Sequence, residues 1–172
     1  MKTLKVILFL TFILSGFKQA KADPPTLSAA LNNVTSAYLG IKNALISNNG
    51  AMAQNKAMEM ITTLNSVPDK DMTADQHALW FKYLNKLEFD SRHINESGAI
   101  DHQREHFANL SDNFFTVIKA FKLNTTTLYR QYCPMKKLYW MSETATIKNP
   151  YYGSGSMAEC GVTKETLKAN AR

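Results

Sequence analysis

The chain has 172 residues and a formal net charge of +6. This length fits one domain with a hydrophobic core of its own. Much of the positive charge lies at the N-terminus, where Lys2 and Lys5 precede an apolar run, residues 6–14, and an Ala20-Lys21-Ala22 segment. A charged start, a short apolar middle and an A-x-A end predict a secretory signal peptide over residues 1–22, cleaved after Ala22.

Removal of this signal peptide would change the electrostatic character of the chain. The segment contains four lysines and no acidic residue, so the formal charge falls to about +2 over the remaining ~150 residues. A basic stripe for nucleic acid is therefore not expected, and the apolar run is too short to span a bilayer. We expect a periplasmic or secreted protein with no nucleic-acid partner and no membrane span after cleavage.

Residues 23–123 predict four amphipathic helices. Thr26 is placed to cap the first helix and Asp101 to cap the fourth, and hydrophobic residues recur at helical spacing in each. In the first helix these residues are Leu27, Leu31, Val34, Tyr38, Ile41 and Leu45, and in the second they are Ala53, Ala57, Met60, Ile61 and Leu64. In the third they are Leu79, Trp80, Tyr83, Leu84, Leu87 and Ile94, and in the fourth Phe107, Leu110, Phe114, Val117, Ile118 and Phe121. Short connections favour an antiparallel four-helix bundle with up-down order.

Residues 124–172 predict a small strand-and-loop module packed on the bundle, within one structural domain. Aromatic-rich runs at residues 128–132 and 138–141 favour strands, while Pro134, Pro150 and nearby glycines mark turns. Residues 164–168 favour a return to helix.

This C-terminal module contains both cysteines, Cys133 and Cys160, and three of the eight methionines. Thiolate and thioether sulfur prefer soft ions such as Cu(I) over hard ions. Cys133 and Met135 would point to the same side of an extended segment, and Met157 and Cys160 would meet across one helical turn. The pattern predicts a site of up to four sulfur ligands for Cu(I) or Ag(I).

The two cysteines leave two interpretations open. Cys133 and Cys160 could be metal thiolates, or they could form a disulfide, since an exported protein meets oxidising conditions. A disulfide across a loop of this size would contribute roughly 3 to 4 kcal/mol in the chain-entropy model, which would help a module without a core of its own.

The neighbouring side chains carry alternatives of the same kind. Met135 and Met157 could fill gaps in packing instead of binding an ion, and Met141 fits packing better than ligation. Trp140 could cover an ion through its ring, but such a residue is more typical of a hydrophobic core.

The histidines form a second candidate metal site. His102 and His106 are spaced i, i+4 on the fourth predicted helix, a spacing that can clamp a metal ion. They flank the apolar stripe on its solvent side, which favours a solvated helix face. His93 lies nearby in sequence, but the sequence does not identify a third convergent ligand.

Several motifs carry a resemblance to a known family. In the helical part they are Tyr38-Leu39-x-x-Lys42-x-Ala44-Leu45, Asp101-x-Gln103-Arg104-x-x-Phe107 and Leu110-Ser111; in the C-terminal part they are Tyr129-x-Gln131-Tyr132-Cys133-Pro134-Met135, Trp140-x-Ser142, Ile147-x-Asn149-Pro150-Tyr151-Tyr152-Gly153 and Met157-x-x-Cys160-Gly161. The chain resembles an uncharacterised family of exported bacterial proteins, a domain of unknown function that also occurs appended to CusB-type heavy-metal efflux adaptor subunits. The resemblance implies a helical bundle with a heavy-metal motif for copper or silver. The chain departs from the pattern at Lys136, where a small residue is expected, and at Met141, where leucine is usual.

Two hypotheses of function follow. The first is an exported Cu(I) or Ag(I) binding protein that would hand its ion to a periplasmic efflux adaptor or another envelope protein. The second is a disulfide-stapled helical interaction module of the cell envelope with no metal role. An enzyme and an organic cofactor are not expected, because the sequence contains no G-x-S-x-G, no H-E-x-x-H and no paired carboxylates on an apolar face.

Overall fold

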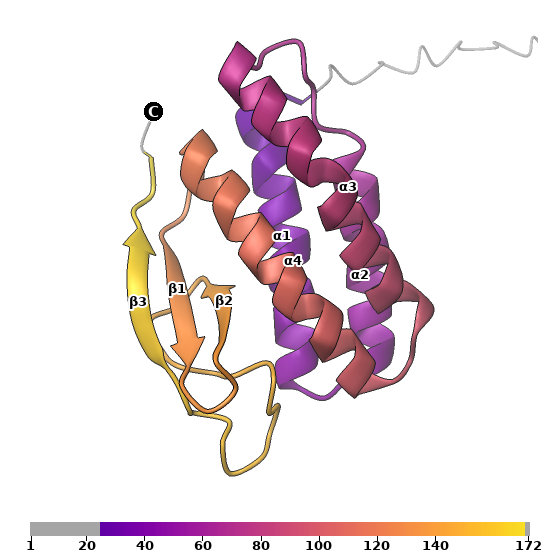
Figure 1. The fold of residues 1–172 in the computed structure, drawn as a ribbon, viewed down its shortest axis with the longest axis vertical. Helices are drawn as coiled ribbons and strands as arrows, with labels where there is room; N and C mark the ends of the chain where they lie inside the picture. Colours follow the sequence, from indigo (N-terminus) through magenta and orange to yellow (C-terminus); the bar gives the residue numbers. More distant parts are fainter. Residues whose placement is uncertain (1–24, 171–172) are drawn as a thin grey trace, which may run out of the picture.

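The computed structural model describes residues 25–170, so the expected signal peptide lies outside the described residues. The chain is mainly helical, with four helices followed by a small three-stranded antiparallel sheet (Figure 1). The elements are α1 (Leu27–Ile46), α2 (Gly50–Leu64), α3 (Ala74–Glu96), α4 (Ile100–Phe121), β1 (Leu128–Cys133), β2 (Leu138–Ser142) and β3 (Val162–Leu167). Within residues 25–170, no helix has the length and apolar character needed to cross a bilayer.

The helix starts agree with the sequence at α1 and differ at α4. Thr26 caps α1, as expected, through its side-chain oxygen. At α4 the N-cap is Ala99, which makes no side-chain cap hydrogen bond. Asp101, predicted as this cap, lies instead in the first turn and pairs with Arg104 at 3.2 Å. The prediction of a cap was wrong, although a carboxylate in the first turn is still favoured by the helix dipole.

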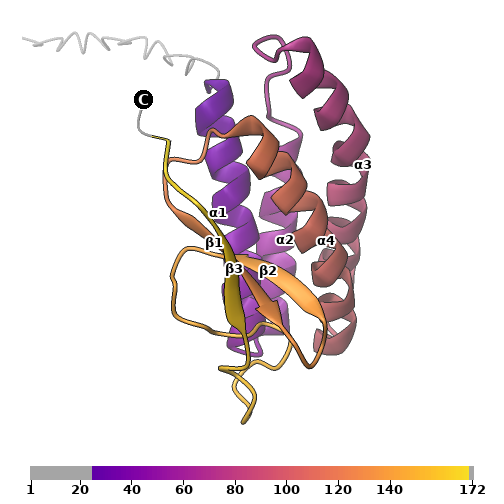
Figure 2. The ribbon, with the colours of Figure 1, turned by 60° about the vertical axis from the view of Figure 1, so that its left-hand side comes forward.

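Aromatic side chains join the helices in the core. Successive helices contact one another along the chain, and Figures 1 and 2 show all four lying side by side with the sheet along one side of them. The fully buried ring of Tyr38 on α1 stacks on two α4 rings, Phe107 at 5.2 Å and Phe114 at 4.3 Å between centroids. Offset stacking of this kind adds to the burial of the rings.

The sheet has the order β2-β1-β3, with β1 in the centre. The predicted strands at residues 128–132 and 138–141 are present as β1 and β2. The helix predicted at residues 164–168 is wrong, because residues 164–167 belong to β3, which pairs with β1. β1 offers an otherwise unpaired edge to residues 162–167, and the β-branched residues Val162, Thr163 and Thr166 suit a strand.

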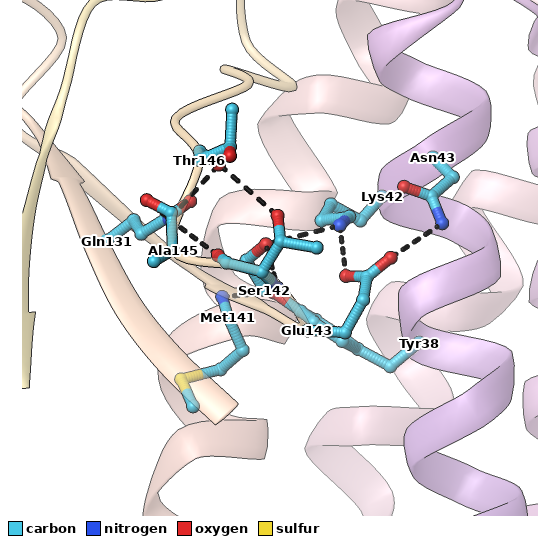
Figure 3. A network of polar contacts seen from close by, with 10 residues as sticks. Tyr38, Lys42, Asn43, Gln131, Met141, Ser142, Glu143, Ala145 and Thr146 are labelled. Atoms are coloured by element: carbon cyan, nitrogen blue, oxygen red, sulfur yellow. Dashed lines mark hydrogen bonds and ion pairs between the residues drawn. The ribbon is translucent and has the colours of Figure 1, made fainter. Parts of the chain in front are cut away.

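A buried polar network attaches β2 to α1 (Figure 3). The hydroxyl of Tyr38 accepts a hydrogen bond from the Met141 N–H at 3.0 Å and shares another with Ser111 at 2.7 Å. One turn further along α1, the Lys42 ammonium pairs with Glu143 and reaches Ser142 at 3.4 Å. The sheet is therefore fixed to the helices by specific hydrogen bonds as well as by apolar packing.

The two partners of this ion pair respond differently to their surroundings. Burial lowers the pKa of Lys42, although Glu143 acts in the opposite direction. Burial also raises the pKa of Glu143, but the pairing with Lys42 outweighs it, and the net shift is downward. The difference follows from exposure: the Lys42 side chain is 4 % exposed, whereas that of Glu143 is 35 % exposed and loses less hydration.

Candidate functional site

Cys133 is the last residue of β1 and opens the tight turn to β2. The turn is closed by the Lys137 N–H, which donates to the Cys133 carbonyl at 2.8 Å, and Lys137 itself has a left-handed φ of 58°. In this turn the main-chain N–H of Lys136 donates to the Cys133 sulfur at 3.4 Å. The fully buried sulfur therefore has a backbone hydrogen-bond donor beside it.

Cys160 lies at the end of the loop that joins β2 to β3. The buried Asn149 side chain holds this loop: its Nδ2 donates to the Cys160 carbonyl at 2.7 Å, and its Oδ1 accepts from the Tyr151 N–H at 2.9 Å. The residue that follows is Gly161, where a Cβ would lie only 2.8 Å from the Trp140 ring. Asn149 and the small Gly161 together allow Cys160 to approach β1 closely.

The structure brings the two sulfurs together, with Cys133 Sγ and Cys160 Sγ 3.5 Å apart and both thiols free. A disulfide would need about 2.05 Å. Two thiolates on one tetrahedral zinc ion, with bonds of about 2.3 Å, would lie about 3.8 Å apart. The 3.5 Å separation therefore lies between that of a disulfide and that of two thiolates on one tetrahedral ion.

The surroundings make the two thiols unequal. Burial acts to raise the pKa of Cys133, but the Lys136 N–H, the Cys160 thiol and Asn149 stabilise its thiolate, and the net shift is downward. The pKa of Cys160 is raised, first by its hydrogen bond to Cys133 and then by burial. Cys133 is therefore the thiol that loses its proton first, and a second deprotonation is opposed by the charge of the first.

The other sulfur and aromatic candidates are placed less favourably. Met135 lies on the β1–β2 turn and is 68 % exposed, and Met157 is half-buried in the loop before Cys160. Met141 and Trp140 are buried in the hydrophobic core, at 0 % and 1 % exposure. These two positions fit packing, the interpretation that their residue types already favoured.

Lys136 and Tyr152 border the thiol pair. The Lys136 ammonium lies 5.3 Å from the centre of the Tyr152 ring. The pKa of Tyr152 is raised by partial desolvation and by the nearby Cys133 and Cys160. Lys136 thus places a cation next to the site.

The histidines form a second cluster, on the helices. His102 and His106 lie on the α4 face toward α3, and their rings are 4.7 Å apart. His93 of α3 completes the group, and the three ligand nitrogens lie within 4.8 Å of one another. His93 was not predicted as the third member. Its position shortly before the turn between α3 and α4 could have indicated it, because such a turn places the end of α3 opposite the start of α4.

A family model covers residues 34–126, more than half of the sequence, from within α1 to just before β1. The chain belongs to this family, described as a protein of unknown function (DUF3347). No curated protein and no solved structure matches the chain.

Only one of the two clusters lies within the residues matched by the DUF3347 model. His93, His102 and His106 lie inside the matched residues, whereas Cys133 and Cys160 lie beyond them. Figures 1 and 2 place the β1–β2 turn, the loop before β3 and the α3–α4 turn at the same end of the molecule. Arg104 links these parts, because its Nε donates to the Pro150 carbonyl at 2.9 Å and its Nη2 to the Leu45 carbonyl at 3.3 Å.

Proposed function

We propose that this DUF3347 protein binds a soft metal ion, Cu(I) or Ag(I), between Cys133 and Cys160. The observation that carries the proposal is the 3.5 Å separation of two free thiols, one at the end of β1 and the other just before β3. Thiolate is a soft ligand and favours soft ions. Two thiolates suffice for Cu(I), and each thiol would release its proton as it binds.

The electrostatics support the same function. The lowered pKa of Cys133 favours the thiolate that a metal ion needs. The Lys136 N–H already stabilises that charge at 3.4 Å. The pKa of Cys160 is raised first by its hydrogen bond to Cys133 and then by burial, and a bound cation would offset both effects by stabilising its thiolate.

The flanking methionines offer a route for the ion. Met135 is exposed on the turn next to Cys133, and Cys160 is only half-buried. In this proposal Met135 meets the ion first and Met157 serves as a further thioether ligand. An exposed thioether beside a buried thiolate suits transfer of an ion from one protein to another.

Export and a partner are part of the proposal. The N-terminal pattern of residues 1–22 supports a signal peptide, and a periplasmic or secreted location would place the site where toxic copper or silver is handled. The partner would be an efflux adaptor or another envelope protein that accepts the ion. The helical part, which we interpret as an antiparallel bundle, would be the scaffold.

The test is an anaerobic titration of reduced protein, residues 23–172, with Cu(I) against a colorimetric chelator after free thiols are counted. We expect one tightly held ion per chain, loss of binding in C133S/C160S, and weaker binding in M135L. Met58 is 50 % exposed on α2, so M58L is the matched control and should bind like the parent. Equal Cu(I) affinity of the parent and the double cysteine variant would refute the proposal.

The second candidate function is a disulfide-stapled interaction module. It is favoured by the same closeness of the sulfurs, because small side-chain rotations and loss of two electrons and two protons to an external oxidant would close the bond. This candidate predicts that reduction lowers stability and that protein taken from its native compartment has no alkylatable thiols. Two fully alkylatable thiols in that protein would exclude a permanent disulfide.

A further inference from the structure

Three histidine rings form a compact group between the end of α3 and the start of α4. His93 stacks on His106 with ring centres 4.4 Å apart and planes 6° apart. His102 meets His106 edge-on at 4.7 Å. One nitrogen from each ring lies within 4.8 Å of the other two. Imidazole nitrogens this close are the ligand set that borderline divalent ions such as Zn²⁺ prefer.

The backbone under this group is held firmly. The buried side chain of Gln103 donates through Nε2 to the carbonyls of Ser97 at 2.6 Å, Ile94 at 3.2 Å and Gly50 at 3.0 Å. These bonds tie the α3–α4 turn to the start of α2. The histidines are therefore carried by rigid helix ends, which keep a metal site in place better than a loop does.

A buried carboxylate orients one of the three rings. Asp90 is 3 % exposed, and its Oδ1 lies 3.0 Å from Nδ1 of His106. A neutral His106 that donates Nδ1–H to this carboxylate has its Nε2 lone pair free for an ion. This carboxylate–histidine pair is the arrangement that orients metal-binding histidines and raises their basicity.

Phe89 covers one side of the histidine group, and the His102 side is exposed to solvent. Phe89 packs against His93 at 4.4 Å and against His106 at 5.8 Å. The His102 side chain is 42 % exposed, with Glu105 at 3.9 Å from its Nδ1. Solvent can therefore reach the group from the His102 side, so a fourth position on an ion would be filled by water or by a ligand from a partner.

We propose that His93, His102 and His106 form a binding site for a divalent ion of the Zn²⁺ class, with Asp90 as the residue that positions His106. In a tetrahedral site with bonds of about 2.0 to 2.1 Å, ligand nitrogens lie about 3.4 Å apart. Rotation of the rings brings the three nitrogens from within 4.8 Å to this spacing. The site uses nitrogen ligands on the helices and is separate from the thiol pair in its ligand chemistry.

The experiment uses C133S/C160S protein, residues 23–172, so that success or failure is independent of the soft-metal proposal. Zn²⁺ is titrated against a chromophoric chelator, and Co²⁺ is used as a spectroscopic probe of the coordination geometry. We expect one ion per chain with a tetrahedral Co²⁺ spectrum. H93A and H102A should each lose binding by more than about 100-fold, because two imidazoles remain where three are needed.

The chain supplies its own control in His77, the fourth histidine, which packs against Phe81 at the other end of α3. H77A should bind Zn²⁺ as the parent does. D90N should weaken binding by about 10- to 100-fold, as loss of an orienting carboxylate does elsewhere. Circular dichroism shows whether each variant is folded. Zn²⁺ should raise the Tm of H77A but not that of H102A, which separates loss of the site from loss of the fold. Folded C133S/C160S protein that takes up no Zn²⁺, or full binding by H93A and H102A, would overturn the inference.

Discussion

Substitution of Tyr38 by phenylalanine tests how the sheet is attached to the helices. The ring would keep its stacking on Phe107 and Phe114, so only the hydroxyl is removed. That hydroxyl accepts from the Met141 N–H and contacts the Ser111 hydroxyl. Burial raises the pKa of Tyr38 far above its usual value, so the group is a neutral phenol at any ordinary pH.

The expected loss can be estimated from the groups left without a partner. Ser111 can turn its hydroxyl to a carbonyl of its own helix, but the buried Met141 N–H has no such choice. A buried donor without a partner costs about 1 to 3 kcal/mol, and we expect Y38F to lower the free energy of unfolding by about 2 kcal/mol. For a chain of this size the corresponding fall in Tm is about 4 to 8 °C.

Urea unfolding followed by circular dichroism measures this loss. Tyr83, half-buried on α3 beneath the ammonium groups of Lys82 and Lys86, supplies the matched control. Y83F removes the same atom away from the sheet and should change the free energy of unfolding by less than about 0.5 kcal/mol. Equal effects of Y38F and Y83F would refute the view that the hydroxyl of Tyr38 anchors β2.

Three further predictions concern the ion pair, a turn and the thiols. The lowered pKa of Glu143 contributes stability that is present above the usual glutamate pKa of about 4.3 and is lost as pH falls through the lower folded value. E143Q should therefore be less stable than the parent by about 1 kcal/mol at pH 7 and equal to it in strong acid; a difference that does not change with pH would contradict this. Gly153 has a φ of 62°, and a Cβ there would overlap Asn48 Oδ1 and lie 2.6 Å from Arg104 Nη2. G153A should lower the free energy of unfolding by at least about 1 to 2 kcal/mol, whereas G155A, where the nearest atom is 3.7 Å away, should have little effect in the same denaturation assay. In reduced protein Cys160 should be alkylated before Cys133, because Cys133 is fully buried. Peptide mapping by mass spectrometry gives the order, and alkylation of Cys133 first would show that burial does not control the reaction.

The helices and two of the strands could be predicted from local pattern. Apolar spacing marks α1 to α4 because each helix buries one face, and the pattern records that face directly. β1 and β2 are rich in aromatic residues and are joined by a turn that contains proline. In these segments the local preference of the chain agrees with its environment in the fold.

β3 and the start of α4 could not be predicted in the same way. β3 is mostly exposed, with Lys164 and Glu165 at its centre, so it lacks an apolar face that would mark it as a strand. Its conformation is decided by pairing with β1, whose residues lie 30 to 39 positions earlier in the chain. At α4 the helix begins at Ile100, one residue before Asp101, and its N-cap Ala99 has no side chain that could mark it as a cap in the sequence.

The two clusters differ in what the sequence reveals. Cysteines are rare in this chain, so Cys133 and Cys160 were evident as a pair, but only the fold gives their 3.5 Å separation. The histidine group depends on the α3–α4 turn, which places His93 against two residues that follow it in the chain. Asp90, the carboxylate beside His106, could not be distinguished from other acids on α3 without the packing.

The position of β3 after the helices and the first hairpin determines when the thiol pair can exist. Cys160 lies two residues before Val162, the first residue of β3, and the pairing of Val162 with Tyr132 is what draws it to Cys133. A chain emerging from a ribosome or a translocation channel has its helices and its first hairpin before this strand is available. The two sulfurs therefore meet only after β3 has joined the sheet, and a shortened chain that lacks β3 would have both cysteines without the site that they form.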